Sequence, residues 1–169
     1  VMFFTYRSTS VYYFKTGKGK SLLLLHGWGA ESRIFNPIIN HYKNNFEVIA
    51  VDFPPFGLSG ELPFDYTIYD YTELINALLK SLNINETYIL CHSFGGRVAA
   101  ALAAQEDNPV KKIIFCASAG ILPKNSLFKM IKKARYNIYK LLYSIKIKQQ
   151  KKLIECFSAD YRNLPQNMR

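Results

Sequence analysis

The chain has 169 residues, of which 49% are hydrophobic and 15% aromatic, so it can bury the core of one ordinary domain and is not intrinsically disordered. No apolar run approaches the ~20 residues of a membrane-spanning helix, and residues 1–15 show no secretory-signal pattern. The net charge of +10 is concentrated late in the chain, because residues 1–110 hold 8 Lys and Arg against 10 Asp and Glu, and residues 111–169 hold 14 against 2.

Strands and helices alternate along the first two thirds of the sequence. Two short aromatic and β-branched runs, at 3–6 and 11–14, suit an antiparallel pair at the edge of a sheet. Apolar runs that predict buried strands lie at 21–26, 46–51, 88–91 and 112–117, and helical patterns lie at 32–42, 66–82 and 94–105. Pro37 is expected to split or shift the first helix, and Thr67 to cap the second. This order predicts an α/β fold with a doubly wound, mostly parallel sheet.

After Gly120 the strand pattern stops. Apolar residues between 122 and 157 are interleaved with lysines, as in basic amphipathic helices. We therefore expect residues 1–119 to form the core and residues 120–169 to begin a helical cap with its lysines in water. The same charge could attract an anionic membrane surface weakly, without stable insertion. No DNA-binding motif accompanies it, so no nucleic-acid partner is expected.

The cysteines bear on compartment and cofactors. Cys91, Cys116 and Cys156 form an odd set without CxxC spacing, and the first two lie inside apolar strand-like runs. They are predicted to be small core side chains in a reducing compartment, which indicates a cytoplasmic protein without disulfides or zinc. No metal and no other cofactor is expected, and the oligomeric state is left open.

One segment carries most of the functional signal. Residues 88–96 read Tyr-Ile-Leu-Cys-His-Ser-Phe-Gly-Gly, an apolar strand that leads into Ser93 and directly into a helix-forming stretch. This is how a chain presents a nucleophilic hydroxyl on a sharp strand-to-helix turn. The simpler alternative is that Ser93 caps the helix. As a nucleophile, Ser93 would need a base, usually a histidine oriented by a carboxylate.

Three segments together resemble the α/β-hydrolase fold family. Residues 26–29, His-Gly-Trp-Gly, are similar to its oxyanion loop, residues 52–59 to its DxPGxGxS loop, and residues 91–96 to its GxSxG nucleophile elbow. Cys91 stands where the elbow usually has glycine, and Pro55 stands where the loop usually has glycine. Cysteine is small enough for the turn, whereas proline excludes a left-handed conformation at its position. The resemblance covers most of residues 3–119.

The resemblance implies a serine hydrolase that attacks a small-molecule ester or related carbonyl compound through Ser93 and an acyl-enzyme. It implies that the backbone N–H groups of Trp28 and Phe94 form the oxyanion hole. Carbon–carbon bond hydrolases of the family also use serine and stay an alternative, so the substrate is left open. The alternative from another class is a non-catalytic protein that binds anionic membrane surfaces through residues 120–169.

None of the three histidines is expected to be the base. His26 is predicted to brace its loop, His92 to point away from Ser93 because the strand pleat alternates, and His41 to be solvated. Relatives place the acid and then the histidine after the nucleophile, and no histidine follows His92 here. We therefore expect an N-terminal fragment whose triad acid and histidine lie beyond Arg169, with little or no turnover by itself.

Overall fold

The computed structural model describes residues 2–119, and the cap predicted at 120–169 lies outside the described residues. The strands are β1 (Met2–Tyr6), β2 (Thr9–Thr16), β3 (Lys20–Leu25), β4 (Phe46–Val51), β5 (Thr87–His92) and β6 (Val110–Cys116). The helices are the short 3-10 helix η1 (Ser32–Phe35), α1 (Asn36–Tyr42), α2 (Ile68–Ser81) and α3 (Phe94–Ala103). These elements match the predicted order, with ends that shift by at most two residues.

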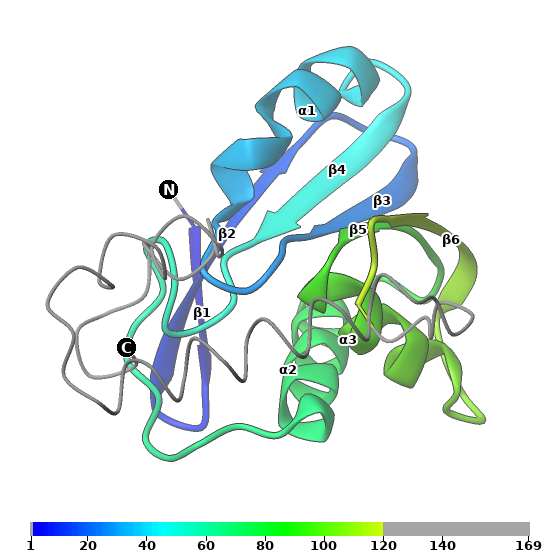
Figure 1. Ribbon diagram of the computed structural model, residues 1–169. Helices are drawn as coiled ribbons and strands as arrows, with labels where there is room; N and C mark the ends of the chain where they lie inside the picture. Colours follow the sequence, from blue (N-terminus) through cyan, green and yellow to red (C-terminus); the bar gives the residue numbers. More distant parts are fainter. Residues whose placement is uncertain (1, 120–169) are drawn as a thin grey trace, which may run out of the picture. The chain divides into compact units, whose positions relative to one another are not determined.

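The strands form one six-stranded sheet in the order β1-β2-β4-β3-β5-β6 (Figure 1). Strands β4, β3, β5 and β6 run parallel, whereas β1 and β2 join antiparallel at one edge. The predicted α/β class with a mostly parallel sheet is therefore confirmed. Because parallel strands end at the same edge of a sheet, the segments that follow β3, β4, β5 and β6 meet there.

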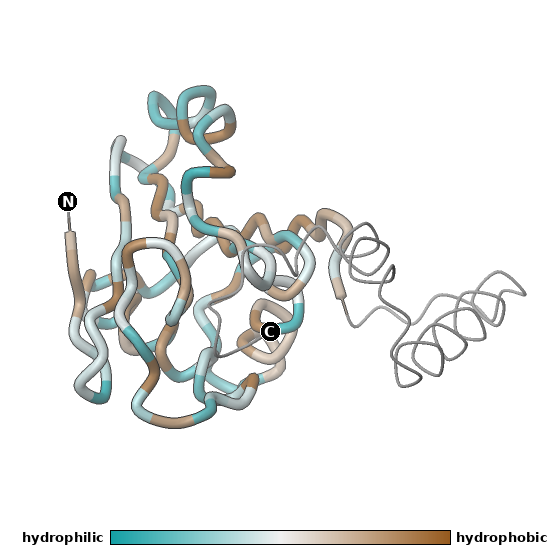
Figure 2. Tube along the Cα trace, turned by 60° about the vertical axis from the view of Figure 1, so that its left-hand side comes forward, coloured by the Kyte–Doolittle hydropathy of each residue, from teal (hydrophilic) through white to brown (hydrophobic). Residues whose placement is uncertain are grey.

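Both faces of the inner strands are buried. Leu22 and Leu24 of β3 pack with Phe35 and Ile39, which come from η1 and α1. Successive strand residues point to opposite faces, so Leu23, which is 0% exposed, faces the other side, where α3 contacts β3. There α2 and α3 lie side by side, away from α1 (Figure 1). In Figure 2 the helical turns at the top of the view carry both hydrophilic and hydrophobic residues.

The helix starts follow from local sequence. Pro37 occupies one of the first two positions of α1, so the predicted split places the 3-10 turn before the proline and the α-helix after it. Thr67 caps α2, because its hydroxyl accepts the Asp70 amide while the Asp70 carboxylate accepts the Thr67 amide. Both sequence predictions are confirmed.

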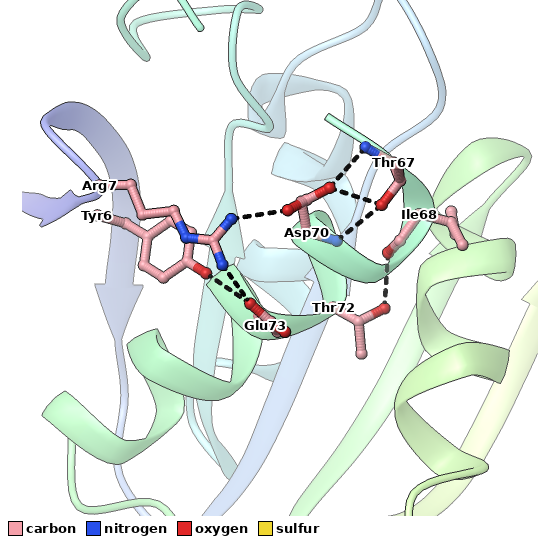
Figure 3. Close-up of polar contacts among 7 residues, drawn as sticks. All are labelled: Tyr6, Arg7, Thr67, Ile68, Asp70, Thr72 and Glu73. Atoms are coloured by element: carbon pink, nitrogen blue, oxygen red, sulfur yellow. Dashed lines mark hydrogen bonds and ion pairs between the residues drawn. The ribbon is translucent and has the colours of Figure 1, made fainter. Parts of the chain in front are cut away.

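An ion-pair cluster joins the β1–β2 turn to the start of α2 (Figure 3). The Arg7 guanidinium donates to Asp70 at 2.7 Å and to Glu73 at 2.6 Å, and the Tyr6 hydroxyl donates to Glu73 at 3.2 Å. The Arg7 carbon also lies 5.3 Å from the centre of the Tyr6 ring. Asp70 thus serves the helix cap and the ion pair together, which attaches the antiparallel edge of the sheet to α2.

Strand β6 differs from the prediction. The apolar pattern at 112–117 predicted a buried strand, but Ile114 is 57% exposed and Phe115 43% exposed. Cys116 is exposed as well, whereas Cys91 is buried as predicted. Within residues 2–119, β6 pairs only with β5, so the described part of the chain does not cover its side chains. None of the described helices is long and apolar enough to cross a membrane.

Candidate functional site

Ser93 stands in a strained turn between β5 and α3. Its φ of 47° and ψ of −110° lie in a region that residues other than glycine rarely adopt, and such strain concentrates at functional sites. It occupies the N-cap position of α3, yet its side chain makes no capping hydrogen bond. Within residues 2–119 the Ser93 hydroxyl has no hydrogen-bond partner at all, so the helix-cap alternative does not explain it.

Neighbouring backbone fixes this turn on two sides. The Gly95 amide donates to the His26 carbonyl at 3.0 Å, which attaches the start of α3 to the end of β3. On the other side, the Ser93 amide donates to the Cys116 carbonyl at 3.2 Å and its carbonyl accepts the Ala119 amide at 2.9 Å. This second support was not predicted from the sequence, although the small residues after β6 (Ala117, Ser118, Ala119) could have indicated it.

Small side chains make these close approaches feasible. A Cβ atom on Gly95 would collide with the backbone carbonyl of Leu25, and one on Gly96 would collide with the Ser118 side chain. Cys91, at the usual glycine position, is fully buried and its thiol donates to the Ile114 carbonyl at 3.4 Å. Burial raises the pKa of that thiol to about 11, so it stays protonated and packs as a small core residue.

His26 braces the loop that follows β3. Its Nε2 accepts the Phe53 amide at 2.8 Å, and its Nδ1 lies 2.7 Å from the Gly27 carbonyl, to which it donates as the Nδ1–H tautomer. The residue is fully buried, and this burial lowers its pKa below the ordinary value of 6.5. Both ring nitrogens are thus engaged in a neutral imidazole, which agrees with the predicted bracing role.

The loop after β3 lies directly against Ser93. A Cβ atom on Gly27 would stand 3.2 Å from the Ser93 Cβ and 2.9 Å from the His92 Nδ1, so a larger residue at this position would force the His92 ring or Ser93 to shift. The next residue in this loop is Trp28, and the residue after Ser93 is Phe94. Neither the Trp28 amide nor the Phe94 amide donates to an acceptor within residues 2–119. Two backbone donors that have no partner in the described part of the chain therefore lie beside the serine.

Asp52 holds the loop after β4. One oxygen of its buried carboxylate accepts the Ser32 amide at 2.6 Å, and the other accepts the Leu58 amide at 2.8 Å. The left-handed turn lies at Gly57, whose φ is 61°, and a Cβ atom there would collide with the Asp52 carboxylate. Pro55 therefore does not have to supply the left-handed conformation that its ring excludes; its bond to Pro54 is cis.

The other histidines do not engage Ser93. The ring of His92 lies against Gly27 with a buried Nδ1 that has no partner in the described chain, and no hydrogen bond within that range joins it to Ser93. His41 is exposed, as predicted, and stands in the last turn of α1, just before β4 begins. It is thus near the amino ends of the parallel strands, at the opposite edge of the sheet from Ser93.

An aromatic cluster packs around the Trp28 and Phe94 side chains, and it was not predicted from the sequence. The Trp28 and Phe94 rings meet edge to face with centres 5.1 Å apart. Phe56 packs on Trp28 at 4.9 Å, and Phe53 and Tyr71 pack on Phe94 at 5.6 and 5.2 Å. The Tyr71 hydroxyl donates to the Pro54 carbonyl at 2.7 Å, and burial raises the pKa of this phenol well above its ordinary value.

The described part of the chain was compared with the requirements of a metal site and of a second ligand pocket. Within residues 2–119 no group of three His, Cys, Asp or Glu side chains is arranged to hold a metal ion. An open pocket of about 420 Å³ is lined by Lys20, Glu47, Lys111 and their neighbours. It lies where the parallel strands begin, at the edge opposite Ser93, and so does not belong to the site described above.

Comparisons with known proteins agree with the observed fold. A family model described as alpha/beta hydrolase fold matches residues 20–166. The uncharacterized hydrolase YugF of Bacillus subtilis is 27% identical over 125 residues, which are 72% of this chain and 46% of YugF. The pimeloyl-[acyl-carrier protein] methyl ester esterase of Legionella pneumophila is 34% identical over 105 residues, which are 62% of this chain and 41% of the esterase.

The likeness extends to solved structures. The crystal structure of a membrane phospholipase A, a bacterial virulence factor, superposes with a TM-score of 0.71 at 22% sequence identity. That match covers 79% of this chain and 44% of the phospholipase. The chain therefore spans less than half the length of each of these three proteins.

Proposed function

The chain belongs to the alpha/beta hydrolase fold family, and from this premise we propose that it supplies the serine nucleophile and oxyanion hole for hydrolysis of an ester or related carbonyl compound. Its relatives include hydrolases, among them the methyl ester esterase. The observation that carries the proposal is Ser93 itself, held at a φ of 47° with an uncapped hydroxyl beside two amides that have no partner within residues 2–119.

The proposed chemistry uses the groups at this edge of the sheet. The Ser93 Oγ attacks the carbonyl carbon while its proton passes to a base, and the carbonyl oxygen becomes an oxyanion. The amides of Trp28 and Phe94 donate to that oxyanion, and each such donor typically contributes about 10²–10³ in rate. Departure of the alcohol, which takes the proton, leaves an acyl-enzyme that water hydrolyses.

The base is the part of this chemistry that the chain's own histidines do not provide. His26 has both nitrogens engaged and burial keeps it neutral, His41 lies at the opposite edge, and His92 makes no hydrogen bond to Ser93 within the described residues. We therefore propose that a histidine and its orienting carboxylate outside these 169 residues complete the site. Without them, Ser93 reacts slowly because its hydroxyl is protonated at neutral pH.

Imidazole in solution offers a test, because it can replace a missing histidine base. The 169-residue chain is incubated with a fluorophosphonate probe, with and without imidazole, and the modified residue is identified by mass spectrometry. We expect slow labelling alone and faster, stoichiometric labelling of Ser93 with imidazole. The Ser93→Ala variant controls for reaction at other residues.

Each outcome has a clear meaning. If imidazole does not accelerate the labelling of Ser93, or if Ser93→Ala labels as quickly, the proposed nucleophile is wrong. If Ser93 labels rapidly and completely without imidazole, the chain contains its own base, and the part of the proposal that concerns the histidine is wrong.

A further inference from the structure

The two proposed oxyanion donors are joined through their own side chains. Their amides belong to residues 66 positions apart, on the loop after β3 and at the start of α3. Their rings nevertheless meet edge to face, with centres 5.1 Å apart and planes at 72°. An oxyanion hole works only if its donors are already aimed at the position that the oxygen will occupy. A direct contact between the two rings constrains the distance between the two backbones that carry the donors.

A third segment, the loop after β4, holds this pair from one side. Phe56 is 4% exposed and packs edge to face on Trp28 at 4.9 Å, and it also lies 6.2 Å from the His26 ring. Phe53, fully buried, packs on Phe94 at 5.6 Å and donates its amide to His26 Nε2. The same loop therefore contacts both donor residues and also the histidine that precedes them.

The loop is itself anchored from two directions. The Asp52 carboxylate fixes its beginning and end through the Ser32 and Leu58 amides. Tyr71 of α2 donates its hydroxyl to the Pro54 carbonyl at 2.7 Å, and its ring packs on Phe94 at 5.2 Å and on Phe53 at 5.4 Å. Aromatic pairs prefer such edge-to-face angles, and each pair contributes about 0.5–1.5 kcal/mol beyond the burial of its area, so these contacts favour one arrangement of the rings.

From these contacts we propose that Phe56 is a positioning residue for the oxyanion hole: its ring holds the Trp28 ring against Phe94 and so keeps the two amides at a working separation. The inference rests on the proposed function, because it assigns a supporting role at that same site. Phe56 touches no reacting atom in this scheme. Its removal is expected to slow reaction at Ser93 while the fold stays intact.

The chain offers a matched control. Phe35 is 4% exposed, as Phe56 is, but it packs with Leu22, Leu24 and Ile39 between η1, α1 and the opposite face of the sheet. Phe35→Leu and Phe56→Leu therefore remove the same atoms from equally buried positions. A purely structural effect of losing a buried ring would appear in both variants. An effect on the amides would appear only in Phe56→Leu.

The first readout is the imidazole-assisted rate of Ser93 labelling by the fluorophosphonate, since the phosphoryl oxygen of the probe develops charge in the oxyanion hole. Removal of a donor costs about 10²–10³, and a misplaced donor retains part of its effect, so we expect Phe56→Leu to lower the rate about tenfold. Phe35→Leu is expected to label at close to the wild-type rate. Phe56→Met, which has nearly the volume of leucine and likewise lacks the ring, is expected to be slowed as Phe56→Leu is.

The second readout needs no reactivity. The chain has a single tryptophan, Trp28, so acrylamide quenching of its fluorescence reports the packing of this ring alone. We expect stronger quenching in Phe56→Leu and Phe56→Met and unchanged quenching in Phe35→Leu. Circular dichroism under the same conditions confirms that each variant is folded, and Phe56→Met serves if Phe56→Leu is not.

The outcomes separate this inference from the proposed function. If the wild-type chain is labelled at Ser93 but folded Phe56 variants label equally fast, or Phe35→Leu is slowed as much, the positioning role is wrong. Unchanged quenching in the Phe56 variants would also overturn it. If the wild-type chain is not labelled even with imidazole, the proposed nucleophile fails, while the quenching measurement still decides whether Phe56 holds the Trp28 ring.

Discussion

Glycine at position 93 should make the protein more stable than alanine does, although glycine usually weakens a fold. Ser93 has a φ of 47° and a ψ of −110°, and a residue with a Cβ atom held in such a region costs about 1–3 kcal/mol. Ser93→Ala keeps the Cβ atom and therefore the strain. Ser93→Gly removes the strain but loses about 0.4–1 kcal/mol because the unfolded chain gains freedom.

The difference in the free energy of unfolding between Ser93→Gly and Ser93→Ala reports the backbone strain at position 93 separately from any loss of the hydroxyl. Neither one has a hydroxyl, and within residues 2–119 the native hydroxyl makes no hydrogen bond that either substitution could break. The relief of strain exceeds the entropic cost, so the Gly variant should be about 1 kcal/mol more stable than the Ala variant. With an m-value of about 1–3 kcal/mol/M, the midpoint of urea unfolding should rise by roughly 0.3–1 M.

The control lies in the same helix. Ala100 is an exposed residue of α3, where Ala100→Gly should lower the free energy of unfolding by about 1 kcal/mol. The same exchange of alanine for glycine is thus expected to have opposite signs at positions 93 and 100. Urea unfolding followed by circular dichroism measures both. If Ser93→Gly is no more stable than Ser93→Ala, the serine is not strained, and the structural basis of the proposed nucleophile is lost.

Three further predictions concern the supports of the site and of the fold. Gly96→Ala should destabilise the protein by about 1–3 kcal/mol because its new Cβ would meet the Ser118 side chain. Adding Ser118→Gly should recover most of the lost stability, and a double variant whose urea midpoint does not recover would contradict this contact. Burial lowers the pKa of His26 below 6.5, so just below pH 6.5 the unfolded chain binds a proton that the folded chain does not. The contribution of His26 to the free energy of unfolding should therefore be fully present above pH 6.5 and fall by about 1.4 kcal/mol per pH unit below it. Urea midpoints measured between pH 7.5 and 5.5 test this, and the midpoint of His26→Gln should change less with pH than that of the wild type. An equal pH dependence in the two proteins would contradict the assignment to His26. Arg7→Gln should cause only a small loss of stability that high salt removes, because the Arg7 ion pairs are exposed; a thermal shift that persists in salt would show that the cluster acts by packing instead.

Local sequence was a good guide to the elements. Apolar runs predicted the strands because a parallel strand is covered on both faces, and Thr67 predicted the start of α2 because capping depends on residues within one turn. The same logic failed at β6, where an apolar run of the same kind is exposed within residues 2–119. A run of apolar residues indicates that a strand must be buried, but the segments that bury it lie elsewhere in the sequence.

The candidate site divides in the same way. The sequence alone predicted Ser93 as a candidate nucleophile and His26 as a loop brace, and the family resemblance added Trp28 and Phe94 as candidate oxyanion donors, since these predictions depend on short motifs and on the small residues beside them. Only the tertiary structure showed the φ of 47° at Ser93, the contact of Gly27 with it, and the ring contact between Trp28 and Phe94. Such features join segments tens of residues apart, and the distance between two segments is set by the register and packing of a whole sheet.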